Sequence, residues 1–445
     1  MKFKMIAAAC AALCSASAFA APLNPATTVP EVSFFIAGAS AQNKALQTVA
    51  ADLFDTSANE VVVIKQSGSS GNAKNTTAWL GKSKAELTGG VSKIMYVVYN
   101  NEGGSNAGVK QVLTNDTTES EANVVKLDGT CTAPALVSGV LTSTCSNAAP
   151  LEAAMALSDV TPQEAVPGVL PTDGNVITVD DLIVSRTALQ GFGVAVNAPL
   201  YAALQAKNIR EELLPASCQG SSAGACQPSI RRADYASLAT NDGSIKDAAS
   251  LLRTADNNAL TLVRRVDSSG TQAASNIFFA NSVCGIQSGT NLVPASSLDF
   301  PVVAGAAFGI SEQGSTSGVK SALNNNTGYK IGVMSLENIP GTSDTFRFVK
   351  IDNVSPNFNG LGVADSLHRK AIASGDYSFA FEMTAMYRNT ATEEQQNLAN
   401  TIIAGLTDST KHNLAGIAYL DGTDYVDGKA ARVTRYGNNC KPAIN

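Results

Sequence analysis

A fixed positive charge beside a serine-rich turn is the feature of this sequence best suited to chemistry. Arg265 is followed by Asp267 and by the turn Ser269-Gly270-Thr271, and a helical pattern of apolar residues begins at once. The first N–H groups of a helix are unpaired and its N-terminus carries a partial positive charge, so an anion can bind there. Arginine adds a planar, always charged fork that matches an oxyanion. Taken alone, the stretch is weak evidence for a site, because Ser-Ser-Gly-Thr is common in ordinary turns.

Three earlier stretches share one design, in which an apolar strand ends, small polar residues turn the chain, and a helix or an acid follows. They are Ala39–Gln42, Gly104–Asn106 and Ser158–Asp159. In open α/β sheets, ligands bind beyond the carboxyl ends of strands, where such loops converge. A carboxylate is useful beside an anion only if the ligand carries a proton, so Asp159 favours hydrogen phosphate over sulfate.

Alternating strands and helices are expected to position these loops. Apolar runs predict strands at 33–37, 61–64, 94–99, 177–183, 191–196, 259–263, 330–334, 346–351 and 377–387. Helical spacing predicts helices over 46–54, from about 109, over 200–206 and over 393–406, with Ser40 as the N-cap of the first. Residues 285–325 are expected to be irregular, and the polar stretch 115–150 to form a surface hairpin. The alternation predicts an α/β fold with mainly parallel sheets.

The first twenty residues have the pattern of a secretory signal peptide. Lys2 and Lys4 precede an apolar run, and small residues lead to a cleavage site after Ala20. The run is too short to span a bilayer, and no later stretch reaches the roughly 18 apolar residues that a membrane helix needs. The mature chain is therefore expected in the periplasm or outside the cell.

Charge and cysteine content narrow the function further. Without the two leader lysines the chain has 29 basic and 37 acidic residues, a formal charge of −8, which disfavours nucleic acid as a partner. The six remaining cysteines suggest disulfides in an exported protein, and 15 pairings are possible. The local choice pairs Cys131 with Cys145 and Cys218 with Cys226, and leaves Cys284 with Cys440. With only two histidines, we expect no metal site, no cofactor and no enzyme activity.

The order of these motifs resembles the periplasmic phosphate-binding proteins of ABC transporters, which have the type II "Venus flytrap" fold. Leu262–Thr271 is similar to that family's Arg-x-Asp-x-Ser-Gly-Thr loop, and Ile36–Ala41 to its N-terminal Gly-Ala-Gly-Ala-Thr-Phe turn. Tyr99–Leu113 resembles its Gly-Ser-Ser-Gly-Gly-Val-Lys-Gln loop, and Ala156–Asp159 its Ala-Ser-Asp. The similarity covers most of residues 32–390 in order.

The resemblance implies a set of ligand-binding residues, with Asp267 orienting the guanidinium of Arg265. The set is Ala41, Gln42, Ser105, Asp159, Arg265, Ser269, Gly270 and Thr271. Gln42-Asn43 stands where the family has Thr-Phe, so only backbone N–H groups remain at that loop. Ser40 is a weaker candidate, and Ser69 competes with Ser105, which we prefer because Gly-Val-Lys-Gln follows it.

The resemblance also implies a two-lobed molecule. Lobe 1 is expected over residues 30–190, with 371–445 returning to it, and lobe 2 over 191–370; both carry inserted disulfide loops. The expected function is capture of phosphate or a similar protonated oxyanion in the cleft between the lobes, as a monomer that serves an ABC permease. The alternative is a secreted or surface protein that reuses the fold for adhesion, assembly or scavenging without transport.

Overall fold

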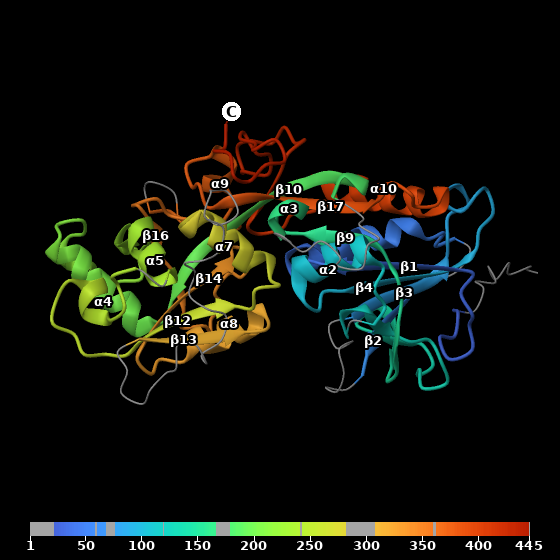
Figure 1. Ribbon diagram of the computed structural model, residues 1–445, viewed down its shortest axis with the longest axis horizontal. Coiled ribbons are helices and arrows are strands. Elements are labelled where there is room, and N and C mark those ends of the chain that lie inside the picture. The colour runs from blue at the N-terminus through green and yellow to red at the C-terminus, as the bar shows by residue number, and fades with distance from the viewer. Residues whose placement is uncertain are drawn as a thin grey trace, which may run out of the picture.

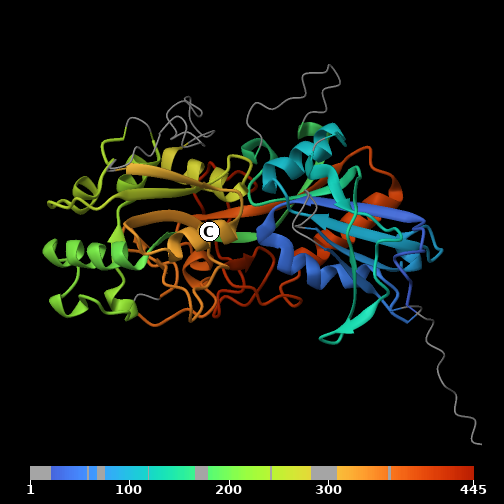
Figure 2. The same ribbon diagram turned by 90° about the horizontal axis from the view of Figure 1, so that it is seen from below.

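The molecule consists of two α/β halves that lie side by side along its longest axis and share one mixed β-sheet (Figures 1 and 2). The computed structural model describes residues 22–57, 60–67, 76–118, 120–165, 179–240, 243–281, 308–358 and 362–444. Two long antiparallel strands, β10 (Leu182–Val196) and β17 (Ala380–Arg388), connect the halves. The predicted α/β class is confirmed, and the exact lobe boundaries remain a prediction.

The N-terminal half is built on three neighbouring parallel strands. β1 (Val32–Gly38) lies between β4 (Ile94–Asn100) and β9 (Ala153–Ser158). Alternate residues of β1 face opposite sides: Phe34 packs against one core and Phe35 against the other. Because the three strands are parallel, their carboxyl ends open at the same edge of the sheet.

Helices cover both faces of this half, and further strands extend its sheet. Helix α2 (Gly104–Thr114) packs on one face, and α1 (Asn43–Val49) with α10 (Glu393–Thr407) on the other. The sheet continues through β3 (Thr76–Lys82), β2 (Val62–Gln66), β7 (Val140–Cys145) and β6 (Ala135–Val137).

The second half repeats the design with β12 (Leu260–Arg265) between β13 (Phe308–Gln313) and β14 (Tyr329–Ser335), all parallel. Its helices are α4 (Ala198–Arg210), α5 (Arg232–Ala239), α6 (Ala248–Leu252), α7 (Gly270–Ala280) and α8 (Thr316–Asn324). The shorter elements are η1 (Ser40–Gln42), η2 (Ala50–Leu53), η3 (Ala85–Leu87), η4 (Ser120–Ala122), β5 (Asn123–Val125), β8 (Ala148–Pro150), α3 (Pro162–Ala165), η5 (Val179–Asp181), η6 (Ala216–Cys218), η7 (Gly224–Cys226), β11 (Ser229–Ile230), β15 (Arg347–Phe348), β16 (Lys350–Ile351) and α9 (Lys370–Ser374).

Strand β10 belongs to both halves. Its first part, Leu182–Gly191, pairs with β17, and its last part, Phe192–Val196, pairs with β14. The chain ends in a C-terminal tail (residues 417–444), which begins with β18 (Ile417–Tyr419) paired to β10. In Figure 1 the tail lies over the crossing between the halves.

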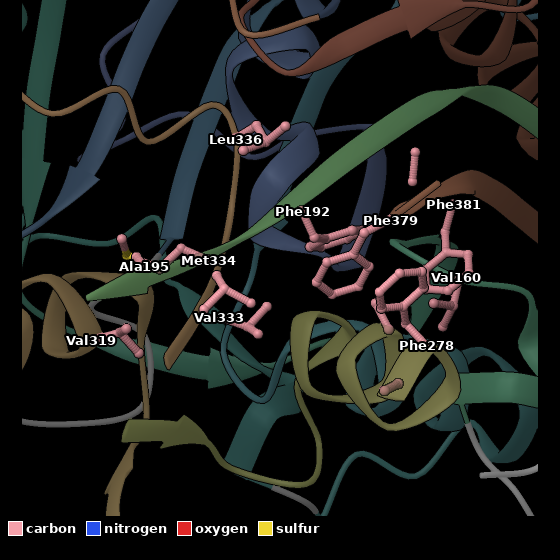
Figure 3. Packing of buried hydrophobic residues seen from close by; sticks show 14 of the residues in the cluster. Val160, Phe192, Ala195, Phe278, Val319, Val333, Met334, Leu336, Phe379 and Phe381 are labelled. Atoms are coloured by element: carbon pink, nitrogen blue, oxygen red, sulfur yellow. The ribbon is translucent and has the colours of Figure 1, made fainter. Parts of the chain in front are cut away.

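An aromatic core links helix α7 to the two connecting strands (Figure 3). The rings of Phe278 in α7 and Phe379 beside β17 are stacked, with centroids 4.4 Å apart. Phe192 of β10 lies 5.5 Å from Phe379, and Val160 lies near this cluster in Figure 3. Burying aromatic rings of this size stabilises the arrangement by roughly 2–3 kcal/mol per side chain.

Several predicted elements differ in the structure. The strands expected at 177–183 and 191–196 are parts of one strand, since Leu182–Val196 is continuous; residues 177 and 178 lie outside the described residues. β13 and α8 lie within the stretch expected to be irregular, where Gly and Ser mask the short apolar runs. The N-cap prediction for Ser40 was wrong, because no side chain caps η1 or α1.

The disulfide predictions fared better. Cys131–Cys145 and Cys218–Cys226 are confirmed, and the first staples a hairpin, as expected for 115–150. Cys440 is also disulfide-bonded, whereas its predicted partner Cys284 lies outside the described residues, as does the predicted signal peptide. Within the described ranges, no helix is both long and apolar enough to cross a membrane.

Candidate functional site

Two helix N-termini meet where the two halves touch. Helix α2 follows β4, and Gly103 and Gly104 turn the chain into it with φ of 71° and 69°. This places Ser105 in the first helical turn, because the helix begins at Gly104 and not at about 109 as the sequence suggested. Helix α7 follows β12 through Ser269, and neither helix has a side-chain cap. Both partial positive charges therefore remain available to an acidic group or an anion.

Backbone and side-chain contacts join these two ends. Asn106 donates from its backbone N–H to Ser268 O (3.1 Å) and from Nδ2 to Asp267 O (2.9 Å). Gly270 lies against Ser105 and Asp159 so closely that any β-carbon there would overlap them. The structure thus brings Ser105, Asp159 and Gly270 together, as the resemblance implied.

Asp159 is the central acid of the site. It follows β9, is 2% exposed, and its Oδ1 has no hydrogen-bond partner among the described residues. Its backbone N–H donates to Ser105 Oγ (3.1 Å). Burial raises the pKa of Asp159 to about 7, although nearby Arg265 acts in the opposite direction. A buried carboxyl oxygen without a partner is costly, and it is a typical feature of a binding site.

Arg265 is held by the loop after β13. Its Nε donates to Gln313 O (3.2 Å), Nη2 to Gly314 O (3.1 Å) and Nη1 to Thr316 Oγ1 (3.1 Å). A guanidinium has five N–H donors, so two are left for a ligand. Burial lowers the pKa of Arg265, and Asp159 opposes that shift, so the two charges lie within electrostatic reach.

The predicted orienting role of Asp267 is corrected by the structure. Its carboxylate pairs with Arg264, not with Arg265. Asp267 lies in the exposed turn after β12, where the chain leaves the sheet and brings it beside Arg264. The guanidinium of Arg265 is oriented instead by the loop at Gln313–Thr316.

The hydroxyl groups of Ser269 and Thr271 are available to donate hydrogen bonds to a ligand. Ser269 and Thr271 are 2% and 5% exposed, and neither hydroxyl is bonded to any other described residue. Ser105 Oγ accepts from Asp159 N–H, which leaves its own proton free for a further acceptor. Ser105 and Ser269 lie at the same contact between the halves as Asp159, beside Gly270 and Gly104.

The N-terminal loop has a structural role that the sequence did not reveal. Gln42 is buried, and its Nε2 donates to Ser158 O (3.0 Å) and Thr384 O (3.3 Å), while Oε1 accepts from Thr187 (3.3 Å). Ala41 packs in a small apolar cluster beside β18. Ser40 is partly exposed, and Ser69 lies outside the described residues. The Gln42 side chain therefore joins β9 to the connecting strands.

Two further groups near Asp159 were missed. Burial and then Asp159 raise the pKa of Glu337 to about 8, while Lys44 lowers it. Tyr99 is fully buried, donates to Ala39 O, and has a pKa well above its usual value because of burial and Asp159. Glu337 follows β14, so its position after a strand end was the available signal. Across the described residues, no group of three or more His, Cys, Asp or Glu is placed to hold a metal ion.

Comparison with known proteins gives similarity of shape only. No protein-family model matches the chain, and neither does any curated protein. An ABC-type phosphate transport receptor from Vibrio cholerae is 13% identical, covering 85% of this chain and 94% of its own, with a TM-score of 0.40. A putative phosphate ABC transporter substrate-binding protein with bound phosphate from Clostridium perfringens is 12% identical. The match covers 86% of this chain and 99% of that chain, with a TM-score of 0.41. A reduced form of OxyR from N. meningitidis is 7% identical. The match covers 87% of this chain and 99% of that chain, with a TM-score of 0.35. Similarity at this level says nothing about a ligand.

Proposed function

We propose that the protein is an exported binding protein that captures a protonated oxyanion, phosphate above all, between its two halves. The observation that carries the proposal is the buried, unbonded Oδ1 of Asp159, set near Arg265 at two uncapped helix N-termini. The two free N–H groups of Arg265 and the hydroxyls of Ser105, Ser269 and Thr271 donate to the ligand oxygens.

The pKa of Asp159 suits a ligand that carries a proton. At a pH above about 7 the carboxylate accepts a hydrogen bond from a P–OH group, which hydrogen phosphate has and sulfate lacks. An unprotonated dianion would instead place negative charge against a buried carboxylate, which strongly disfavours binding. The site therefore binds an anion that carries a proton in preference to one that does not, as Asp159 alone suggested from the sequence.

Binding between the halves favours the closed form. The ligand contacts Ser105 and Asp159 from one half and Arg265, Ser269 and Thr271 from the other, so it stabilises the closed state through differential contacts. No covalent bond is broken. The closed form is then the species that an ABC permease in the inner membrane would recognise, and the predicted signal peptide would bring the protein there.

A second function, use of the fold for surface adhesion or assembly, has one observation in its favour. Strand β6 is at the end of the sheet order, and its Leu136 and Val137 are 73% and 56% exposed. Exposed apolar side chains on an edge strand can pair with another chain. This function predicts no oxyanion binding at Asp159.

Calorimetric titration with phosphate tests the proposal. Protein stripped of ligand should bind phosphate, and Arg265→Gln should weaken binding by at least about 100-fold, since a charge-assisted contact is worth roughly 1.5–3 kcal/mol and two are lost. Arg253→Gln is the charge-matched control, because Arg253 pairs with Glu211 at the surface of the same half. Equal binding by the Arg265 variant would overturn the proposal, and no binding by the wild type would leave the second function.

A further inference from the structure

The loop that carries Asp159 is held at each of its residues. In this Asp159 loop (Asp159–Thr161), Val160 O accepts from Thr384 Oγ1 (2.8 Å). Thr161 N–H donates to Glu164 Oε2 (2.9 Å). Glu164 lies three residues after Thr161, so its carboxylate reaches back to the start of α3 as in one half of a capping box.

Glu164 depends on the C-terminal tail. It is 6% exposed, and both its oxygens accept from Asn439: the backbone N–H reaches Oε1 (2.9 Å) and Nδ2 reaches Oε2 (2.9 Å). A buried carboxylate is tolerated only with such partners. Helix α3 has four residues and cannot hold this geometry by itself.

Asn439 is itself fixed to strand β17. Its Oδ1 accepts from Glu382 N–H (2.9 Å), and Asn439 is 2% exposed. The Glu382 carboxylate, which is fully buried, accepts from Thr434 Oγ1 (2.6 Å) and from the backbone N–H groups of Arg435 and Gly437 (both 2.7 Å). The turn Thr434–Asn439 therefore wraps around one buried carboxylate and presents Asn439 to a second.

Arg435 closes the same turn. Its Nε donates to Ala380 O (3.0 Å) and Nη2 to Ser378 O (2.9 Å), and its guanidinium lies 5.0 Å from the centroid of Phe381. Cys440 comes directly after Asn439 and is disulfide-bonded. The tail is thus attached to β17 before Asn439 and at Asn439 itself, and a disulfide holds the residue after it.

We propose that Asn439 is a positioning residue for Asp159. Through Glu164 it fixes Thr161, and with Thr384 it sets the Asp159 loop so that the carboxyl group stays buried near Arg265. The inference rests on the proposed function, and it assigns the C-terminal tail, absent from the motifs that suggested the site, a role in ligand affinity.

The test compares Asn439→Ala with Asn438→Ala. Asn438 is the neighbouring asparagine and is exposed. Among the described residues, its side chain accepts a hydrogen bond only from the N–H of Cys440. Phosphate titrations across pH 5–9 should show at least a tenfold loss of affinity for Asn439→Ala and none for Asn438→Ala. The pH midpoint assigned to Asp159 should also move down in Asn439→Ala, because a looser loop admits water and reduces the effect of burial on that pKa.

Hydrogen exchange separates this inference from the proposed function. Without ligand, the Thr161 amide should exchange at least tenfold faster in Asn439→Ala, whether or not phosphate binds. A folded Asn439→Ala with wild-type exchange at Thr161, or with wild-type affinity and pH midpoint, overturns the inference. If Asn439→Ala does not fold, Glu164→Gln keeps the shape and should shift the exchange and the midpoint in the same directions; no shift would overturn the inference as well. A wild-type protein that binds no phosphate contradicts the proposed function alone.

Discussion

A β-carbon added at Gly270 would lie 2.1 Å from Ser105 Oγ, although the two residues belong to opposite halves of the molecule. The same β-carbon would lie 2.8 Å from both Cβ and Oδ2 of Asp159. Real β-carbons do not approach other atoms so closely, so the two halves can meet here only because residue 270 has no side chain. Glycine in the Ser-Gly-Thr turn is thus required by contact between the halves.

Gly270→Ala should therefore hold the halves apart at the site. We expect phosphate affinity to fall by at least about 100-fold, since the ligand loses contacts from one half, while the melting temperature changes little. Gly129→Ala is the control, because its β-carbon would meet nothing within 4 Å. Calorimetric titration measures both variants, and unchanged affinity in Gly270→Ala would show that the contact does not close the site.

The pKa of Asp159 gives the stability a defined pH dependence. Its folded value of about 7 exceeds its unfolded value of 3.8, so between these values the folded protein binds more protons than the unfolded chain. The free energy of unfolding should fall as pH rises from about 4 through 7, by at most about 4 kcal/mol for this group. Glu337 acts in the same direction up to about pH 8.

Comparison with Asp159→Asn isolates this contribution. At pH 8.5 the variant should be more stable than wild type. This difference in the free energy of unfolding should shrink as the pH falls to 4.5. Denaturant unfolding at several pH values measures the difference. Parallel curves for the two proteins would mean that Asp159 titrates near its usual pKa.

The same substitution should change which anion binds. A neutral amide removes the buried negative charge and offers an N–H donor, so Asp159→Asn should bind sulfate at pH 8 at least tenfold more tightly than wild type does. Wild type should gain sulfate affinity as pH falls below 7, because a protonated Asp159 donates a hydrogen bond. If sulfate affinity changes neither with pH nor with the substitution, the anion binds at a place other than Asp159.

The hairpin disulfide should matter for stability and not for the ligand. Replacing Cys131 and Cys145 by alanine opens a loop with a sequence separation of 14. A loss of about 3 kcal/mol is expected from chain entropy. Phosphate affinity should stay within about twofold, because β6 and β7 lie at the far end of the sheet from the site. A large loss of affinity would tie the hairpin to ligand binding.

Much of the fold was predictable because its strands are short apolar runs. β4 and β14 were located within one residue at each end, and α10 within one. β3 was missed because its run Thr76–Lys82 mixes polar and apolar residues, although it is buried by pairing with both β2 and β4. Such pairing depends on distant partners that local periodicity does not show.

The site was predictable where the position of a motif after a strand already determined where its residues lie. Ser105, Asp159 and Gly270 come together as expected, because each follows a strand whose end lies at the contact between the halves. The partners of Arg265 were not predictable, since they come from Gln313–Thr316 in a stretch that looked irregular. Asn439 was not predictable for the same reason, because long-range packing brings it to Glu164. Glu337 follows the end of β14 and could have been found from that position.

Titration of the wild-type protein at pH 8 with phosphate and, separately, with sulfate is the most direct test of selection by a buried carboxylate. Asp159 is ionised at this pH, so only an anion that carries a proton can bond to it. We predict saturable binding of one phosphate per chain and no measurable binding of sulfate. Equal binding of the two anions, or binding of neither, would contradict an oxyanion site built on Asp159 and Arg265.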